Sequence, residues 1–165
     1  MSVGSPALPW VALPVQSFVS QARKEMPEVE TIACVSAVET AADKLSALVW
    51  RVLARSRGEG DDPAFIRHVH DLAILEVMAL NSREFPALVL TLLEKDVGRG
   101  KPPPEVSALA PAERVARALR ILREDAGYRT EYERFVTGMS YAAEGETPSF
   151  EHALKGLDRL VKLVF

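Results

Sequence analysis

Cysteine is almost missing from this 165-residue chain, which has only Cys34. A lone cysteine can form neither an internal disulfide nor a structural zinc site, which indicates a reducing compartment. Apolar runs of the roughly 18 residues needed to span a bilayer are also missing. The first residues lack the basic stretch of a signal peptide and are interrupted by Pro6, Pro9 and Pro14. We therefore expect a cytoplasmic protein that does not insert into a membrane.

An excess of positive charge is missing as well, because the formal net charge is -3. The chain as a whole has no attraction for nucleic acid, so RNA binding would need a local basic patch. Acidic neighbours would weaken such a patch, and a fan of arginines is usually a solvated helix face. The candidate cations are Arg99, Lys101, Arg114, Arg117, Arg120 and Arg123, the last four of them three residues apart.

Hydrophobic residues make up 48% of the chain, enough for a buried core, and most of them recur at helical spacing. In the segment 37–55, for example, Val38, Ala41, Leu45 and Leu48 lie three or four residues apart. The helices predicted from such spacing and from capping residues cover 17–25, 37–55, 63–80, a segment beginning at 81–82, a segment from Pro111 to a stop at Gly127, 130–142 and 148–165.

Two short segments near the N-terminus, 11–18 and 31–36, are rich in β-branched residues and are bounded by proline or polar residues. Each predicts a short strand. The sequence therefore predicts a mainly α fold: a single helical domain over 1–165, with a bundle of about six or seven helices and at most a small β-ribbon near the N-terminus.

Two helical motifs are the most informative for function. Lys44, Leu45, Ala47, Leu48 and Arg51 form a Lys-Leu-x-Ala-Leu-x-x-Arg pattern. The following helix carries Arg67-His-Val-His-Asp71-Leu72.

These motifs resemble the AbiEii/AbiGii nucleotidyltransferase toxin family, in which such a lysine helix precedes an Arg-Asp-x-x-Asp-Leu signature. His68 stands where the family has the first aspartate. The resemblance is strong over 36–80 and weaker over 132–160, so it covers a C-terminal helical portion of the family. It implies Lys44 and Asp71 as catalytic residues, and Arg51, Arg67 and His68 as substrate-binding residues.

The resemblance also implies transfer of a nucleotide from a nucleoside triphosphate to an RNA or protein acceptor. Such chemistry needs Mg²⁺ held by carboxylates. In the family, a glycine turn and an acid-x-acid pair lie upstream of the lysine helix. Gly4-Ser5 is only superficially similar to that turn. Glu28-Val29-Glu30 is the one nearby acidic pair, and we expect it to be a solvated surface pair.

We therefore expect no metal ligands in this chain and no activity from the chain alone. Mg²⁺ and a nucleoside triphosphate would be required once a catalytic domain completes it. The implied partners are an N-terminal catalytic domain or an antitoxin. The alternative is a non-enzymatic helical module that binds another protein.

Simpler structural interpretations remain open for the same residues. Lys44 could be a solvated lysine paired with Asp43, and Arg67 could pair with Asp71 one turn away. His68 and His70 are two residues apart on a helix, so they point about 200° apart and are poorly placed to share a zinc ion. Because a short loop favours antiparallel helices, we expect Lys44 and Asp71 to be neighbours.

Overall fold

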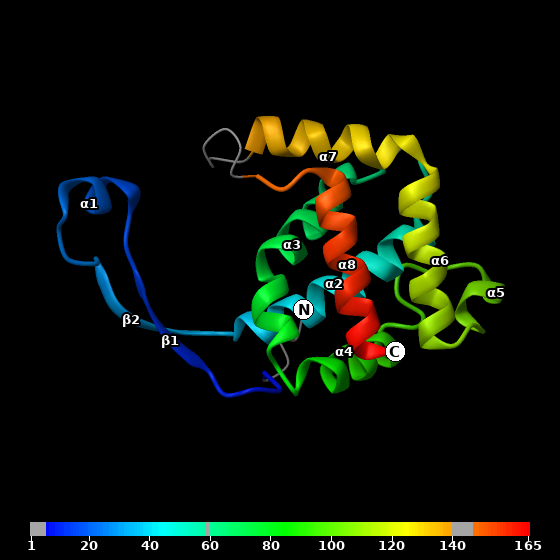
Figure 1. Ribbon diagram of the computed structural model, residues 1–165, viewed down its shortest axis with the longest axis horizontal. Helices are drawn as coiled ribbons and strands as arrows, with labels where there is room; N and C mark the ends of the chain where they lie inside the picture. Colours follow the sequence, from blue (N-terminus) through cyan, green and yellow to red (C-terminus); the bar gives the residue numbers. More distant parts are fainter. Residues whose placement is uncertain (1–5, 59, 140–146) are drawn as a thin grey trace.

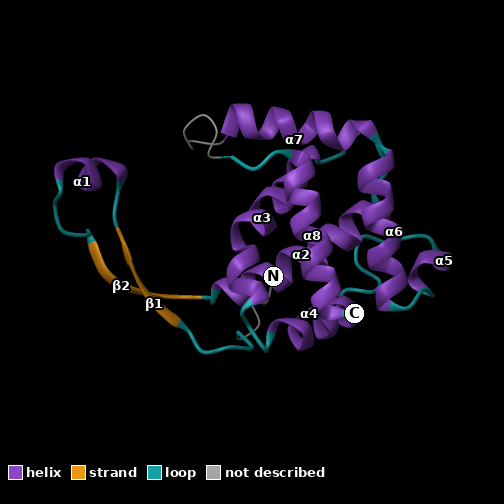
Figure 2. Cartoon of the chain, in the orientation of Figure 1, coloured by secondary structure: helices purple, strands orange, loops and turns teal. Residues whose placement is uncertain are grey.

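The structure, a computed structural model, describes residues 6–58, 60–139 and 147–165. A body of packed helices carries a long two-stranded arm that extends away from it (Figures 1 and 2). Within the described residues there are eight α-helices, six of them longer than seven residues. The predicted mainly helical class with a small N-terminal ribbon is confirmed. Gly4-Ser5 and the predicted helical residues 140–142 lie outside the described part.

The arm is an antiparallel hairpin of β1 (Val11–Val15) and β2 (Val29–Cys34). Val11 pairs with Cys34 and Leu13 with Ile32, but Val15 pairs with Val29, so β2 contains an additional residue between these pairs. This bulge keeps the paired side chains on one face although Ile32 and Val29 are three residues apart. Every residue of the arm's two strands except Cys34 is exposed.

The tip of the arm is a small hydrogen-bonded lobe around α1 (Phe18–Arg23). Ser17 caps this helix by accepting a hydrogen bond from the Ser20 amide at 3.1 Å. The Glu28 carboxylate accepts from both the backbone amide and the hydroxyl of Ser17. The first predicted strand therefore ends at Val15 because Ser17 begins a helix.

The base of the arm is fixed to the body on both sides. The Glu39 carboxylate, nearly buried, accepts hydrogen bonds from the amides of Ala7 at 2.8 Å and Leu8 at 3.0 Å, just before β1. After β2, Ser36 caps helix α2 (Ala37–Ala54) by accepting from the Glu39 amide. The hairpin thus projects from two anchored ends.

Helices α2 and α3 (Arg67–Leu80) form the centre of the body. The predicted helix 63–80 is divided, because Asp62 caps a 3₁₀ turn, η1 (Pro63–Ile66), before α3. The apolar faces of α2 and α3 meet in a shared core that includes Ala41, Leu45, Leu48, Val69 and Leu72, each at most 1% exposed. Small alanines on α2 allow α3 to approach closely.

The remaining helices surround this pair. They are α4 (Phe85–Lys95), the single turn α5 (Pro104–Ser107), α6 (Pro111–Glu124), α7 (Ala126–Met139) and α8 (Phe150–Val164). Helix α8 packs along α3, and α4 and α6 pack on α2. Figure 1 shows α7 along one edge of the body, joined to α6 at a sharp corner.

The boundary predicted at Gly127 is wrong. Helix α6 ends at Glu124, and Gly127 lies in the first turn of α7. Asp125 has an extended backbone, with ψ of 102°, and its carboxylate accepts a hydrogen bond from the Gly127 amide at 2.8 Å. Asp125 therefore ends one helix and caps the next, so the glycine is not needed as a stop.

An ion-pair network connects the end of α2 to α7. Arg55, whose side chain is 5% exposed, bonds to both oxygens of Asp61 and of Glu131. Its guanidinium also lies over the rings of Phe65 and Tyr128, about 5 Å from each centroid. Arg57 adds a third hydrogen bond to Glu131, at 2.6 Å. Despite the cost of burial, these partners raise the pKa of Arg55, so it stays charged.

Glu131→Ala is expected to lower the free energy of unfolding by about 2 to 4 kcal/mol, because it leaves the buried Arg55 guanidinium only partly paired. Urea denaturation followed by circular dichroism measures this change. Asp158→Ala is the matched control, since it removes a half-exposed ion pair with Arg123 and should change stability by under about 1 kcal/mol. Equal effects of the two substitutions would contradict the structural role of the network.

Candidate functional site

The candidate site begins with a contact between the two central helices. The Lys44 ammonium on α2 donates a hydrogen bond to the Asp71 carboxylate on α3, with 2.5 Å between Nζ and Oδ2. The two side chains are 25% and 29% exposed, so the pair lies at the edge of the core and is reachable from solvent. The predicted proximity of Lys44 and Asp71 is confirmed, and the alternative pair of Lys44 with Asp43 is not found.

Two further cations lie beside this pair. Arg51 is seven residues after Lys44 on α2, hence on the same helix face, and Arg67 is one turn before Asp71 on α3. Arg51 contacts Asp62 at 3.0 Å, and its Nε is buried without a hydrogen-bond partner. Arg67 is exposed, and the Arg67–Asp71 pair suggested by the sequence is absent because Asp71 bonds to Lys44 instead.

His68 lies among these charges. Burial, together with the positive charges of Lys44, Arg51 and Arg67, lowers the pKa of His68 to about 4, while Asp71 opposes them. Its Nδ1 atom is buried and has no hydrogen-bond partner. The imidazole is therefore neutral at pH 7 and carries a free polar atom next to three cations. The charges of the other four residues proposed from the sequence thus all act on His68, and among the five the direct contact is that of Lys44 with Asp71.

His70 points to different neighbours, as the helical spacing predicts. Its ring meets Phe135 of α7 edge to face, with centroids 5.6 Å apart, and also lies near Tyr132. Burial of Tyr132 raises the pKa of its hydroxyl to about 12. The His70 Nδ1 also lies 3.7 Å from Oδ1 of Asp71, so His70 connects the packing between α3 and α7 to the edge of the charged site.

The arginines spaced three residues apart on α6 do not form one basic surface. Arg114 is 7% exposed and donates a hydrogen bond to the Leu93 carbonyl at 2.9 Å, so it packs inside the body. Arg123 pairs with Asp158 of α8. Arg120 stays exposed, and Arg117 is half-buried. The sequence spacing did not reveal this difference, because it depends on the distant groups that each arginine meets, the Leu93 carbonyl and the Asp158 carboxylate.

The chemistry of the site suits an anion better than a metal ion. Mg²⁺ binds oxygen ligands, and among the described residues Asp71 is the one carboxylate that Lys44 contacts directly. In the described ranges, no group of three or more histidine, cysteine, aspartate or glutamate side chains could hold a metal ion. Glu28 is engaged by Ser17, and Glu30 is exposed, both on the arm. The residues at Lys44 therefore do not form a divalent-metal site by themselves.

An open groove of about 280 Å³ begins at Arg51. Apolar side chains supply one part of its lining, and charged side chains at the C-terminal end of α2 and in the segment after it supply another. The groove is lined by Trp50, Arg51, Ala54, Arg55, Ser56, Gly60, Asp61, Asp62, Phe65 and Gly100. The groove therefore lies next to the cation cluster, by which we mean Lys44, Arg51 and Arg67, and gives it a partly apolar neighbour.

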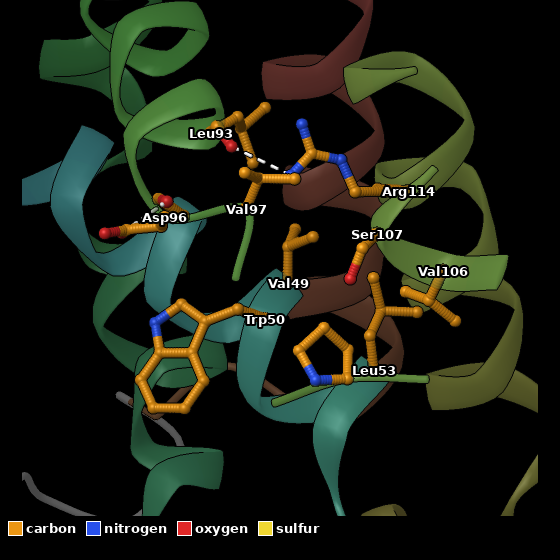
Figure 3. Close-up of a pocket in the computed structure, with 11 residues that line it drawn as sticks. Val49, Trp50, Leu53, Leu93, Asp96, Val97, Val106, Ser107 and Arg114 are labelled. Atoms are coloured by element: carbon orange, nitrogen blue, oxygen red, sulfur yellow. Dashed lines mark hydrogen bonds between the residues drawn. The ribbon is translucent and has the colours of Figure 1, made fainter. Parts of the chain in front are cut away.

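A separate cavity lies behind Trp50, between α2, α4, α5 and α6 (Figure 3). The Nε atoms of Arg114 and Trp50 are buried there without partners, and Asp96 is bonded to Ser46 at 2.9 Å. The cavity volume is about 20 Å³, room for about one water molecule. It is too small for a nucleotide, so we do not place the function here. Sequence reasoning missed this cavity because its polar residues come from four separate segments.

The chain matches the family described as nucleotidyl transferase AbiEii toxin, type IV toxin–antitoxin system, over residues 1–156. It therefore belongs to the AbiEii nucleotidyltransferase toxin family. The match includes the arm, so limiting the resemblance to the helices after residue 36 was too narrow. The description of the family as a toxin implies an antitoxin counterpart.

No curated protein and no solved structure gave a significant match to the chain. Among the helices that the structure describes, none has both the length and the apolar character needed to cross a bilayer.

His68 should titrate with a midpoint near pH 4 in the folded protein, well below the ordinary value of 6.5. Because its folded pKa is below its unfolded pKa, the contribution of His68 to stability should be fully present above pH 6.5 and be lost as the pH drops from 6.5 toward 4. NMR of the imidazole protons measures the midpoint. Lys44→Met should move it upward, since one repelling charge is lost, and Arg120→Met should not. A midpoint at 6.5 would contradict the description of the site.

Proposed function

We propose that this chain binds the triphosphate of a nucleoside triphosphate at Lys44, Arg51 and Arg67, as part of a nucleotidyltransferase toxin. The observation that carries the proposal is the meeting of three cations and a neutral histidine where α2 and α3 pack. Lys44 and Arg51 are partly shielded from water, and such cations bind phosphate oxygens more strongly than fully solvated ones.

The roles of the individual residues follow from their contacts. Lys44 is a compact charge that can leave Asp71 for a phosphate oxygen, whereas Asp71 holds it in place until then. The Arg51 guanidinium, whose Nη1 pairs with the exposed Asp62, can turn toward the same phosphates. The neutral imidazole of His68 can accept or share a proton next to a phosphate.

The groove beyond Arg51 supplies space for the nucleoside. The Trp50 ring forms part of its lining and carries the Arg51 guanidinium over one face, 5.1 Å from the centroid. Ligand sites commonly combine such a partly apolar wall with a few charged groups. We propose that the sugar and base lie in this groove while the phosphates reach Lys44.

Transfer of the nucleotide requires divalent metal, and we propose that its carboxylate ligands come from another polypeptide segment or partner. Bound Mg²⁺ would neutralise the phosphates and stabilise the leaving pyrophosphate. This chain would then supply nucleotide binding and orientation, and the isolated chain would be inactive. We expect it to act in the cytoplasm on an RNA or protein acceptor and to be countered by an antitoxin.

The second candidate function is a non-enzymatic interaction module. One specific observation favours it, namely the apolar arm, whose side chains such as Phe18 and Met26 are each 80% exposed. Exposed apolar surfaces of this kind usually mark contacts with other proteins. The two functions are compatible, because the arm and the Lys44 site occupy different parts of the chain.

Lys44→Met and Arg51→Met should each weaken binding of a nucleoside triphosphate by roughly tenfold or more, since each removes one charged contact. The chain has only two tryptophans, so a Trp10→Phe background leaves Trp50 as the reporter of the groove. Titration of its fluorescence measures the affinity. Arg120→Met, at an exposed arginine on α6, should bind like the parent. No change of Trp50 fluorescence at millimolar nucleotide would argue against the site.

The isolated chain should leave each labelled nucleoside triphosphate untransferred when it is incubated with Mg²⁺ and total RNA. The reason is that the carboxylates described at these cations, Asp71 and Asp62, are paired with Lys44 and Arg51 and so are not free to hold a metal ion. Gel analysis of labelled RNA and protein makes the measurement. Robust labelling by purified protein, abolished by Asp71→Asn, would show that the chain holds a complete metal site.

A further inference from the structure

The arm has one apolar face that no part of the described chain covers. Opposite residues in the two strands share a face, and here they are apolar at Val11, Leu13, Val15, Val29 and Ile32. These side chains are between 40% and 47% exposed. The other face carries small or polar residues such as Ala12, Thr31 and Ala33. An isolated two-stranded ribbon of this kind is only marginally stable in water, so the face requires a partner.

The two edges of the ribbon differ. β1 contains Pro14, which has no amide hydrogen and blocks the addition of another strand. β2 has no proline over Val29–Cys34, so its outer edge presents free amide and carbonyl groups. A further strand can therefore join the ribbon at β2.

The same chain carries a second uncovered apolar surface. On α3, Ile74, Val77 and Met78 lie three and four residues apart, hence on one helix face, and are 59%, 68% and 54% exposed. In Figure 1, α3 lies on the side of the body that faces the arm, but the arm stands away from it. The exposed fractions show that the arm does not cover this stripe within one chain.

We propose that the chain forms a two-fold homodimer in which the arms pair along β2 and the resulting four-stranded sheet covers the α3 stripes. A second copy fits because it offers both surfaces in reciprocal positions, as two-fold symmetry requires. In antiparallel pairing of β2 with β2 of the second copy, Glu30 near the start of one strand lies opposite the end of the other strand. The two glutamates are thereby kept apart, whereas parallel pairing would bring them together.

The available area agrees with a stable dimer. Full burial of a large apolar side chain removes on the order of 100 Å² from water. The arm and the stripe together expose thirteen such side chains, most of them by about half, which gives roughly 700 Å² per copy. A typical stable interface buries about 800 Å² per partner. The thirteen exposed side chains counted here are those of Trp10, Val11, Leu13, Val15, Phe18, Val19, Met26, Val29, Ile32, Val35, Ile74, Val77 and Met78.

Analytical ultracentrifugation of the full chain over a range of micromolar concentrations tests the proposal. The expected result is a dimer, and Leu13→Glu on the arm and Val77→Glu on α3 should each raise its dissociation constant roughly 100-fold or more by burying a charge. Leu163→Glu is the matched control, because Leu163 is 39% exposed on α8 outside both surfaces. Circular dichroism verifies that each variant remains helical.

Hydrogen exchange tests the edge assignment. In the dimer, β2 amides that point away from β1 should be protected, and this protection should be lost in the Leu13→Glu variant. A monomer at every concentration, a monomer that binds only an unrelated protein, or a dimer that ignores both substitutions would overturn the proposal. Nucleotide binding by the monomeric Leu13→Glu variant is measured separately, so failure of the dimer and failure of the Lys44 site are distinguishable.

Discussion

The packing of α2 against α3 is the constraint on which the other features depend. Ala41, Leu45 and Leu48 bring the two helices into close contact with Val69 and Leu72. This contact fixes the height of Lys44 relative to Asp71 and places His68 among three cations. It also fixes the start of α2, where Glu39 and Ser36 hold the two ends of the arm. Loss of this packing would therefore separate the residues of the charged site and would also detach the base of the arm from the body.

The charged site and the Arg55 network use similar residues for different purposes. Arg55 is almost fully enclosed and has two carboxylate partners, Asp61 and Glu131, so its charge is satisfied within the protein. At Lys44, by contrast, two carboxylates, Asp71 and Asp62, face the three cations Lys44, Arg51 and Arg67 at the surface of the body. Such an excess of positive charge attracts an anionic ligand, whereas a balanced network stabilises the fold.

Much of the fold could be predicted from sequence because the helices have clear apolar periodicity and capping residues. The antiparallel placement of Lys44 and Asp71 followed from a short loop and from the rise per residue of a helix. The separation of the arginines on α6 could not be predicted, since burial of Arg114 depends on the distant Leu93 carbonyl. The bulge in β2 likewise could not be predicted from the sequence, because it depends on which residues of the two strands pair.

The central claim is that the cations around His68 bind a triphosphate. The most direct test is an NMR titration of His68 with and without inorganic tripolyphosphate, in wild-type protein. A polyanion held by Lys44, Arg51 and Arg67 would offset their positive charges, so we predict that the pKa of His68 rises above its value of about 4 when tripolyphosphate is present. An unchanged His68 midpoint at saturating tripolyphosphate would contradict the account, because the anion would then bind elsewhere or not at all.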